Sequence, residues 1–259
     1  MDILLCIDDT DSLESRGTGE LAEIIADAIE KNGWGRSSEV TRHQLLLHRD
    51  IPYTSHNSSM CFRAEIKEHH LRNIINYAED FLQHESEPKA DPGLCVVALD
   101  NLEHGGSNKL IDFGYKAKRK ILTKKDAYDL AKELNIHLSE HGGTGQGVIG
   151  ALAGAGLRLS GNDGWFKGAH KIKTTNNIIT VSELCSYKNI DKVRSIKGGY
   201  LDDSEEIHLG KLVKTMLIDG QAVVLVYRTE AENHRPIWKS CSKQQLLERE
   251  EMNHNVVCK

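Results

Sequence analysis

Apolar residues recur along the chain with two different spacings, which together predict alternating strands and helices. Short apolar or alternating runs predict strands at 3–7, 44–48, 59–66 and 93–99. Apolar residues three and four positions apart predict amphipathic helices over 21–29, 71–82 and 124–134. This order of elements favours a mixed α+β fold.

The last third of the chain is richer in strand patterns. They cover 178–181, 212–218 and 222–227, with a turn predicted at Asp219-Gly220, and the charged segment 244–252 is predicted to be helical or frayed. We therefore expect a two-lobed protein with a mixed sheet. Residues 1–90 would form an acidic-motif part and residues 91–259 a glycine-loop part, unless the chain interleaves the two.

Composition narrows the class of protein. The chain has 259 residues, of which 39% are hydrophobic and 27% charged, as expected for a soluble globular protein. No apolar run approaches the length of a membrane span, and the N-terminus lacks the pattern of a signal peptide. Six scattered cysteines without a C-x-x-C pair favour free thiols in a reducing compartment. We expect a cytoplasmic protein that binds no membrane.

The net charge and the local distribution of charge point to different partners. The net charge of -5 argues against a general attraction to nucleic acid, although local patches can still bind it. A basic run between residues 116 and 125 is either a solvated face or a contact to the phosphates of a nucleotide or an RNA. Its cations are Lys116, Lys118, Arg119, Lys120, Lys124 and Lys125.

The candidate chemistry begins at the end of the first predicted strand. Asp8, Asp9 and Asp11 follow the apolar run directly. Clustered carboxylates repel one another, and a divalent cation such as magnesium, which usually also binds substrate phosphates, removes that repulsion. The alternative is an ordinary turn, because Asp, Thr and Ser are common turn residues.

A glycine-rich segment at 141–147 is the second candidate. Its glycines allow the backbone to turn N–H groups toward an anion, and the small-residue segment behind it can form a closely packed helix. Because the preceding segment looks helical, the pattern is not a dinucleotide-binding fingerprint. The loop either contacts a phosphate or substrate, or is a tight turn that leads into the helix.

Four motifs, in matching order over roughly residues 1–170, resemble the archaeal tRNA(Ile) agmatinylcytidine synthetase family. They are the I-D-D-T-D-S start, the segment 49–57 with its Ile-Pro-Tyr core, the Asp-Pro-Gly-Leu strand entry at 91–94, and G-Q-G-V-I-G-A-L-A at 145–153. The resemblance implies an ATP- and magnesium-dependent enzyme with a kinase-like N-terminal part and a ferredoxin-like, agmatine-binding-like part. Such an enzyme activates the carbonyl of a tRNA cytidine, and agmatine then displaces the phosphate.

The resemblance also assigns roles to residues of this chain. Catalysis and metal binding fall on Asp8, Asp9 and Asp11, and the family's autophosphorylated threonine falls on Thr18. The expected contacts to the nucleotide or the amine substrate are Gly17, Gly142, Gly143, Thr144, Gly145, Gln146 and Gly147.

Three departures from the family keep the substrate open. The family's OB-fold and zinc ribbon are not expected in this chain, Gln146 stands where the family has arginine, and Ser55-His56 replaces an Arg-Gly pair. The acceptor is therefore either an RNA, with or without a separate RNA-binding partner, or a smaller nucleotide or amine. The alternative to an enzyme is a non-catalytic module that binds a nucleotide or a polyamine.

Overall fold

The computed structural model describes residues 1–259 except 13–14, 52–56, 104, 230–236 and 248–259. The described chain divides into two compact units, Met1–Ser160 and Gly161–Lys259. The predicted helical segment 244–252 lies within the described residues only up to 247, and residues 244–247 are helical.

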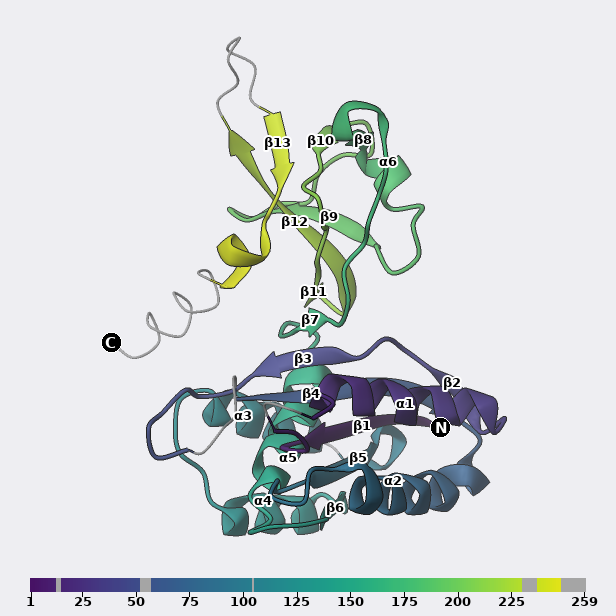
Figure 1. The fold of residues 1–259 in the computed structure, drawn as a ribbon, viewed down its shortest axis with the longest axis vertical. Helices are drawn as coiled ribbons and strands as arrows, with labels where there is room; N and C mark the ends of the chain where they lie inside the picture. Colours follow the sequence, from purple (N-terminus) through teal and green to yellow (C-terminus); the bar gives the residue numbers. More distant parts are fainter. Residues whose placement is uncertain (13–14, 52–56, 104, 230–236, 248–259) are drawn as a thin grey trace. The chain divides into compact units, whose positions relative to one another are not determined.

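The first unit is built on an antiparallel sheet with strand order β6-β5-β1-β4-β3, and β2 pairs with β4 beside β3 (Figure 1). The central strand β1 pairs with β4 and β5 at its two edges, and its apolar residues Ile3 to Ile7 are buried. The strands are β1 (Asp2–Asp8), β2 (Gly35–Ser37), β3 (Thr41–Gln44), β4 (Ser58–Ile66), β5 (Gly93–Ala98) and β6 (His137–Glu140).

Helices cover both faces of this sheet. The alternation of β1 sends Ile3, Leu5 and Ile7 toward α1 (Thr18–Lys31) and α2 (Leu71–Glu85). It sends Leu4 and Cys6 into a second core on the opposite face. That core contains α3 (Gly106–Ala117), α4 (Lys124–Glu133) and α5 (Gly147–Leu159). Of the two short 3-10 turns, η1 (Glu68–His70) directly precedes α2, and η2 (Leu99–Asn101) directly follows β5.

Helix α5 packs on its neighbours through glycines. A Cβ at Gly154 would lie 2.2 Å from Ser59 Oγ and 2.6 Å from Cys6 Sγ, so this face of the helix touches the sheet directly. On the other side, a Cβ at Gly156 would lie 2.1 Å from the carbonyl oxygen of Leu110 in α3. The expected closely packed helix behind the glycine loop is confirmed.

Most predicted elements of this unit are present, but three predictions were wrong or incomplete. The strand expected at 44–48 lies earlier in the chain, as β3 at Thr41–Gln44, and residues 45–48 form a loop. Helix α3 was not predicted, since its apolar residues are interrupted by Lys109 and Asp112 on its exposed side. The segment before the glycine loop is the strand β6 rather than a helix.

The second unit consists mainly of short strands, with order β7-β11-β12-β13-β10-β8 and with β9 parallel to β12. The turn at Asp219-Gly220 is confirmed, and both residues have positive φ, 51° and 75°. The elements are β7 (Trp165–Phe166), η3 (Thr175–Asn177), β8 (Ile178–Thr180), α6 (Val181–Leu184), β9 (Lys192–Ser195), β10 (Glu206–His208), β11 (Thr215–Ile218), β12 (Gln221–Thr229) and β13 (Ile237–Ser240).

The chain thus contains both helices and sheets, as predicted for a mixed α+β fold. Contacts divide the chain after Ser160, whereas the sequence pattern suggested a boundary near residue 90. Strand β5 lies beyond residue 90, yet it pairs with β1 inside the first unit. The functional assignment of 1–90 and 91–259 stays a prediction. None of the helices within the described residues has the length and hydropathy of a membrane span.

The glycine contacts of α5 make a testable prediction about stability. Gly156→Ala should lower the free energy of unfolding by about 2 kcal/mol, because the clash with the α3 backbone outweighs the ~1 kcal/mol gain in helix propensity. Thermal or denaturant unfolding measures this change. Gly210→Ala is the control, since its Cβ would meet Ser240 Oγ at an ordinary 3.6 Å. Equal stability of Gly156→Ala and the wild type would contradict the packing described here.

Candidate functional site

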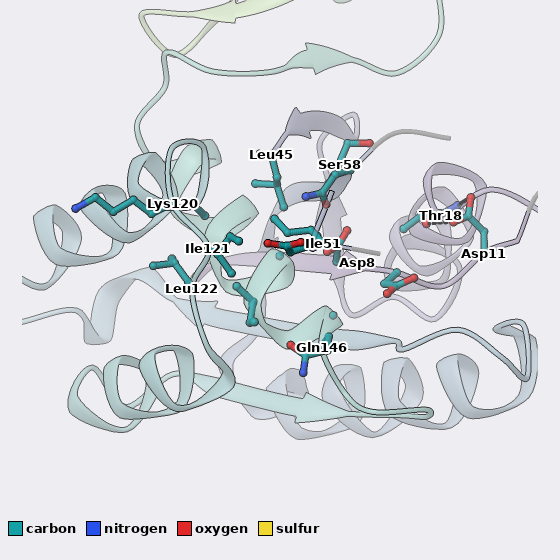
Figure 2. A pocket seen from close by; sticks show the side chains of 17 residues that line it. Asp8, Asp11, Thr18, Leu45, Ile51, Ser58, Lys120, Ile121, Leu122 and Gln146 are labelled. Carbon is teal, nitrogen blue, oxygen red and sulfur yellow. Dashed lines mark hydrogen bonds between the residues drawn. The ribbon is translucent and has the colours of Figure 1, made fainter. Parts of the chain in front are cut away.

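The first unit contains a pocket of about 360 Å³ at the end of β1 and the start of α5 (Figure 2). Residues far apart in the sequence line it, and they include all three predicted carboxylates. The lining residues are Asp8, Asp9, Asp11, Thr18, Leu45, Asp50, Ile51, Asn57, Ser58, Ala117, Lys120, Ile121, Leu122, Gln146, Gly147, Ile149 and Gly150.

Asp8 is the last residue of β1 and lies deepest of the three carboxylates. Only 8% of its surface is exposed, and its side chain lies against the first turn of α5, where a Cβ at Gly150 would be 1.7 Å from Asp8 Oδ2. Burial raises the pKa of Asp8 well above its usual value, and the charges of Asp9 and Asp11 raise it further. The absence of a side chain at Gly150 is therefore what leaves room for this carboxylate.

Asp9 turns the chain out of the strand. Its φ of 52° lies in the left-handed region, which non-glycine residues adopt rarely and mostly at special sites. Burial raises the pKa of Asp9 to about 6, and the charges of Asp91 and Asp11 contribute in the same direction. The alternation of β1 therefore ends at Asp8 and does not continue through Asp9.

Asp11 joins the carboxylates to the start of α1. Its side chain accepts hydrogen bonds from the Thr18 hydroxyl at 3.2 Å and from the Thr18 backbone N–H at 3.4 Å. The Thr10 hydroxyl donates to Thr18 Oγ1 at 3.1 Å. Thr18 is 5% exposed and is the first helical residue, while Gly17 occupies the N-cap position. The Thr18 hydroxyl therefore lies between Thr10 and Asp11 at the edge of the pocket.

The carboxylates suit a cation shared with phosphates better than a site built by protein ligands alone. No group of at least three His, Cys, Asp or Glu side chains in the described part of the chain is arranged to hold a metal ion. Magnesium, however, is usually held by one or two carboxylates together with substrate phosphates and water. The raised pKa values of Asp8 and Asp9 show mutual repulsion and burial, which a cation would relieve. The donor set therefore fits Mg²⁺ that arrives with a nucleotide.

The glycine loop contributes less to the pocket than its sequence predicted. Only Gln146 and Gly147 line it, and Gly142, Gly143, Thr144 and Gly145 do not. The Thr144 N–H and hydroxyl both donate to the Asp91 carboxylate, the hydroxyl at 2.6 Å, and the Gly147 N–H donates to the Asp91 carbonyl at 3.1 Å. Asp91 thus already occupies an anion position inside the loop.

The far side of the loop is fixed by a second set of contacts. Lys124 donates to Glu140 at 2.7 Å and to the Thr144 carbonyl at 2.8 Å, and Tyr128 donates to Glu140 at 2.7 Å. Gly145 has a φ of +72° and lies so close to Glu140 that a Cβ would be 1.8 Å from its carboxylate. These contacts hold the loop in one conformation and present the first turn of α5 to the pocket.

The basic run is divided among different roles. Lys120 lines the pocket, Lys124 holds the glycine loop, and Lys125 pairs with Asp129 on α4. The run is therefore not one solvated face, and its contact with the phosphates of a nucleotide or an RNA stays a prediction.

Sequence reasoning missed the apolar part of the lining and the role of Asp91. Leu45, Ile121 and Leu122 reach the pocket from loops, and no local pattern connects them with the carboxylates. Asp91 was predicted only as part of a strand entry, because its partner Thr144 lies 53 positions further along the chain. Part of the predicted motif at 49–57 lies outside the described residues.

Part of the chain is similar to known proteins. No family model matches the chain. It is 33% identical, over 156 residues, to the tRNA(Ile) 2-agmatinylcytidine synthetase TiaS of Haloquadratum walsbyi, a match that covers 58% of this chain and 32% of that protein. Part of this chain is TiaS-like. The resemblance found in the sequence motifs is confirmed.

Solved TiaS structures agree with this relationship. Apo TiaS, a tRNA(Ile) agmatidine synthetase, has a TM-score of 0.50 and 25% identity, covering 60% of this chain and 35% of that one. The complex of TiaS with its isoleucine tRNA and ATP has a TM-score of 0.51 and 26% identity, covering 60% and 36%. The chain spans about a third of the length of the TiaS proteins it matches.

Because the carboxylates of the pocket are crowded, we expect their negative charges to lower the stability of the folded protein at neutral pH. The pKa of Asp9 is higher in the folded protein than in the unfolded chain. Its contribution to stability is therefore fully present when the pH is below the ordinary pKa of an aspartate, and it is lost as the pH rises through about 6. In EDTA, Asp9→Asn should therefore raise the melting temperature at pH 7.5 and change it little at pH 4. Asp27→Asn, at an exposed position that pairs with Lys31, is the control and should raise it at neither pH. An Asp9→Asn melting temperature at or below that of the wild type at pH 7.5 would exclude this repulsion.

Proposed function

We propose that the first unit is the catalytic part of an ATP- and Mg²⁺-dependent enzyme of the phosphoryl-transfer or ligase type, related to the enzymes of tRNA cytidine agmatinylation. The observation that carries this proposal is the pocket itself, which brings Asp8, Asp9 and Asp11 together with Thr18 and the first turn of α5. The similarity to TiaS, one structure of which is a complex with an isoleucine tRNA and ATP, supports the same function.

In this proposal Asp9 and Asp11 hold Mg²⁺ together with nucleotide phosphates, and Asp8 completes the negative charge beneath them. The ion would neutralise charge on the transferring phosphoryl group. The N-terminus of α5, at Gln146 and Gly147, faces the pocket and its helix dipole favours the phosphates. The remaining glycine-loop residues, Gly142 to Gly145, act by holding that turn in place.

Thr18 is the proposed phosphoryl acceptor within the protein. Its hydroxyl donates to Asp11, so Asp11 would take the hydroxyl proton as Thr18 Oγ1 forms a bond to the γ-phosphorus. The bond from that phosphorus to the β–γ bridging oxygen breaks, and ADP leaves. Gly17 lies at the N-cap of α1 next to Asp11, and a Cβ there would meet Asp11 Oδ2 at an ordinary 3.6 Å.

The acceptor substrate, partners and compartment extend this proposal. Agmatine or a related amine and a tRNA are the proposed partners by similarity to TiaS, with a smaller nucleotide or amine as the other possibility for this chain. A separate RNA-binding partner would be needed if the chain cannot hold tRNA itself. We place the protein in the cytoplasm, where its free cysteines stay reduced.

The finer architecture is also part of the proposal. Elements β1-α1-β3-β4-α2-β5, with strand order β5-β1-β4-β3, follow the β-α-β-β-α-β arrangement of ferredoxin-like folds. This supports a ferredoxin-like part in residues 2–98, earlier than the sequence motifs suggested. The kinase-like character of the N-terminal part rests on its pocket chemistry.

A non-catalytic module that binds a nucleotide or a polyamine is the second candidate. Gln146 supplies no positive charge to the pocket, and Asp91 takes the Thr144 N–H that an incoming phosphate could have used. Both features weaken phosphate binding without affecting the attraction of the carboxylates for a cation.

Magnesium dependence tests the metal part of the proposal. Asp9→Asn should weaken the binding of ATP in Mg²⁺ by about tenfold or more and change it little in EDTA, because the lost carboxylate acts only through the ion. Isothermal titration measures both constants. Equal affinity of the mutant and the wild type in Mg²⁺ would remove Asp9 from the metal site.

Substitutions at Thr18 separate the enzyme from the binding module. Thr18→Ser keeps the hydroxyl near Asp11 and should keep ATP turnover, whereas Thr18→Ala should lose turnover by about a hundredfold or more. Melting temperatures measured with ATP present check that both variants are folded. If Thr18→Ala binds ATP and hydrolyses it like the wild type, Thr18 has no part in the chemistry and the binding module becomes the better explanation.

A further inference from the structure

The pocket has two unlike ends. Asp11 and Thr18 lie at one end in Figure 2, Ile121 and Leu122 lie at the opposite end, and Asp8 lies between them. Ala117 and Ile149 add apolar surface to the lining. An occupant that fills the whole pocket must therefore combine a charged group with an apolar or aromatic one.

Ile121 is an unusual component of this lining. It is 49% exposed although it is a large apolar residue, and it lies in the short loop between α3 and α4 rather than in a core. Apolar side chains left exposed at a pocket wall are typical of a surface that a ligand covers. Leu47 has a similar exposure, 52%, but does not line the pocket.

Two of the polar side chains in the lining are already engaged by the protein. The Asn57 amide donates to the Leu46 carbonyl at 2.7 Å, and the Ser58 hydroxyl accepts from Arg42 at 3.0 Å. Ile121 and Leu122 themselves offer only apolar side chains, which suits the face of a flat ring.

We propose that Ile121 and Leu122 form the surface on which the base of the nucleotide packs, with its phosphates directed toward the carboxylate end. This inference rests on the proposed function and specifies how that pocket recognises its nucleotide. Ile121 and Leu122 argue for a base here rather than for a diamine-like ligand. Their apolar side chains offer neither a negative charge nor a hydrogen-bond acceptor to the second positive charge of a molecule such as agmatine.

Binding of two magnesium-loaded probes, ATP and inorganic tripolyphosphate, tests the inference by isothermal titration. Ile121→Ala should weaken ATP binding about tenfold, since it removes most of one apolar contact surface, and should leave tripolyphosphate binding unchanged. Leu47→Ala, an equally exposed position outside the pocket, should change neither constant. Leu122→Ala, checked for an unchanged melting temperature, should repeat the effect of Ile121→Ala.

The outcomes separate this inference from the function on which it rests. If the wild type binds neither probe, the proposed function fails, and the inference fails with it. If the wild type binds ATP but Ile121→Ala and Leu122→Ala bind it equally well, only the inference is overturned. It is also overturned if the two variants lose ATP and tripolyphosphate to the same extent, or if they weaken agmatine binding instead of ATP binding.

Discussion

The close contact between α5 and the central strands is the constraint on which the first unit depends. Gly150 and Gly154 bring the helix backbone against β1 and β4, at distances that no side chain would allow. Because the first turn of α5 is fixed in this way, the Asp8 carboxylate and the end of the glycine loop must lie beside each other. The pocket is thus a consequence of helix packing and not of loop geometry alone.

That packing also creates an electrostatic cost. It buries Asp8 at the strand end, and the left-handed backbone of Asp9 keeps a second carboxylate beside it. Both have raised pKa values because burial and neighbouring charges disfavour their ionised forms. A protein site that concentrates this cost in one place is suited to a cation, whose binding offsets it.

The sequence predicted those parts of this arrangement that depend on local pattern. The apolar run before Asp8 predicted β1, and the spacing of Leu21 and Ile25 predicted α1, because burial on one or both faces decides these elements. Strand β6 was missed because its four residues are only partly buried and show no clear alternation. The Asp91–Thr144 contact joins residues 53 positions apart, so no local pattern could have predicted it.

The Asp91 contact changes how the glycine loop can be used. A loop whose N–H groups were free would bind phosphate directly, but here a carboxylate of the protein already accepts from Thr144. A phosphate that displaced Asp91 would have to replace the hydrogen bonds between Asp91 and Thr144. It would also bring negative charge toward Asp9, whose pKa the Asp91 charge already raises. The less costly route leaves Asp91 in place and binds the phosphates at the first turn of α5 with a cation between them and Asp9. The glycines then serve to fix a binding surface that lies just beyond them in the sequence.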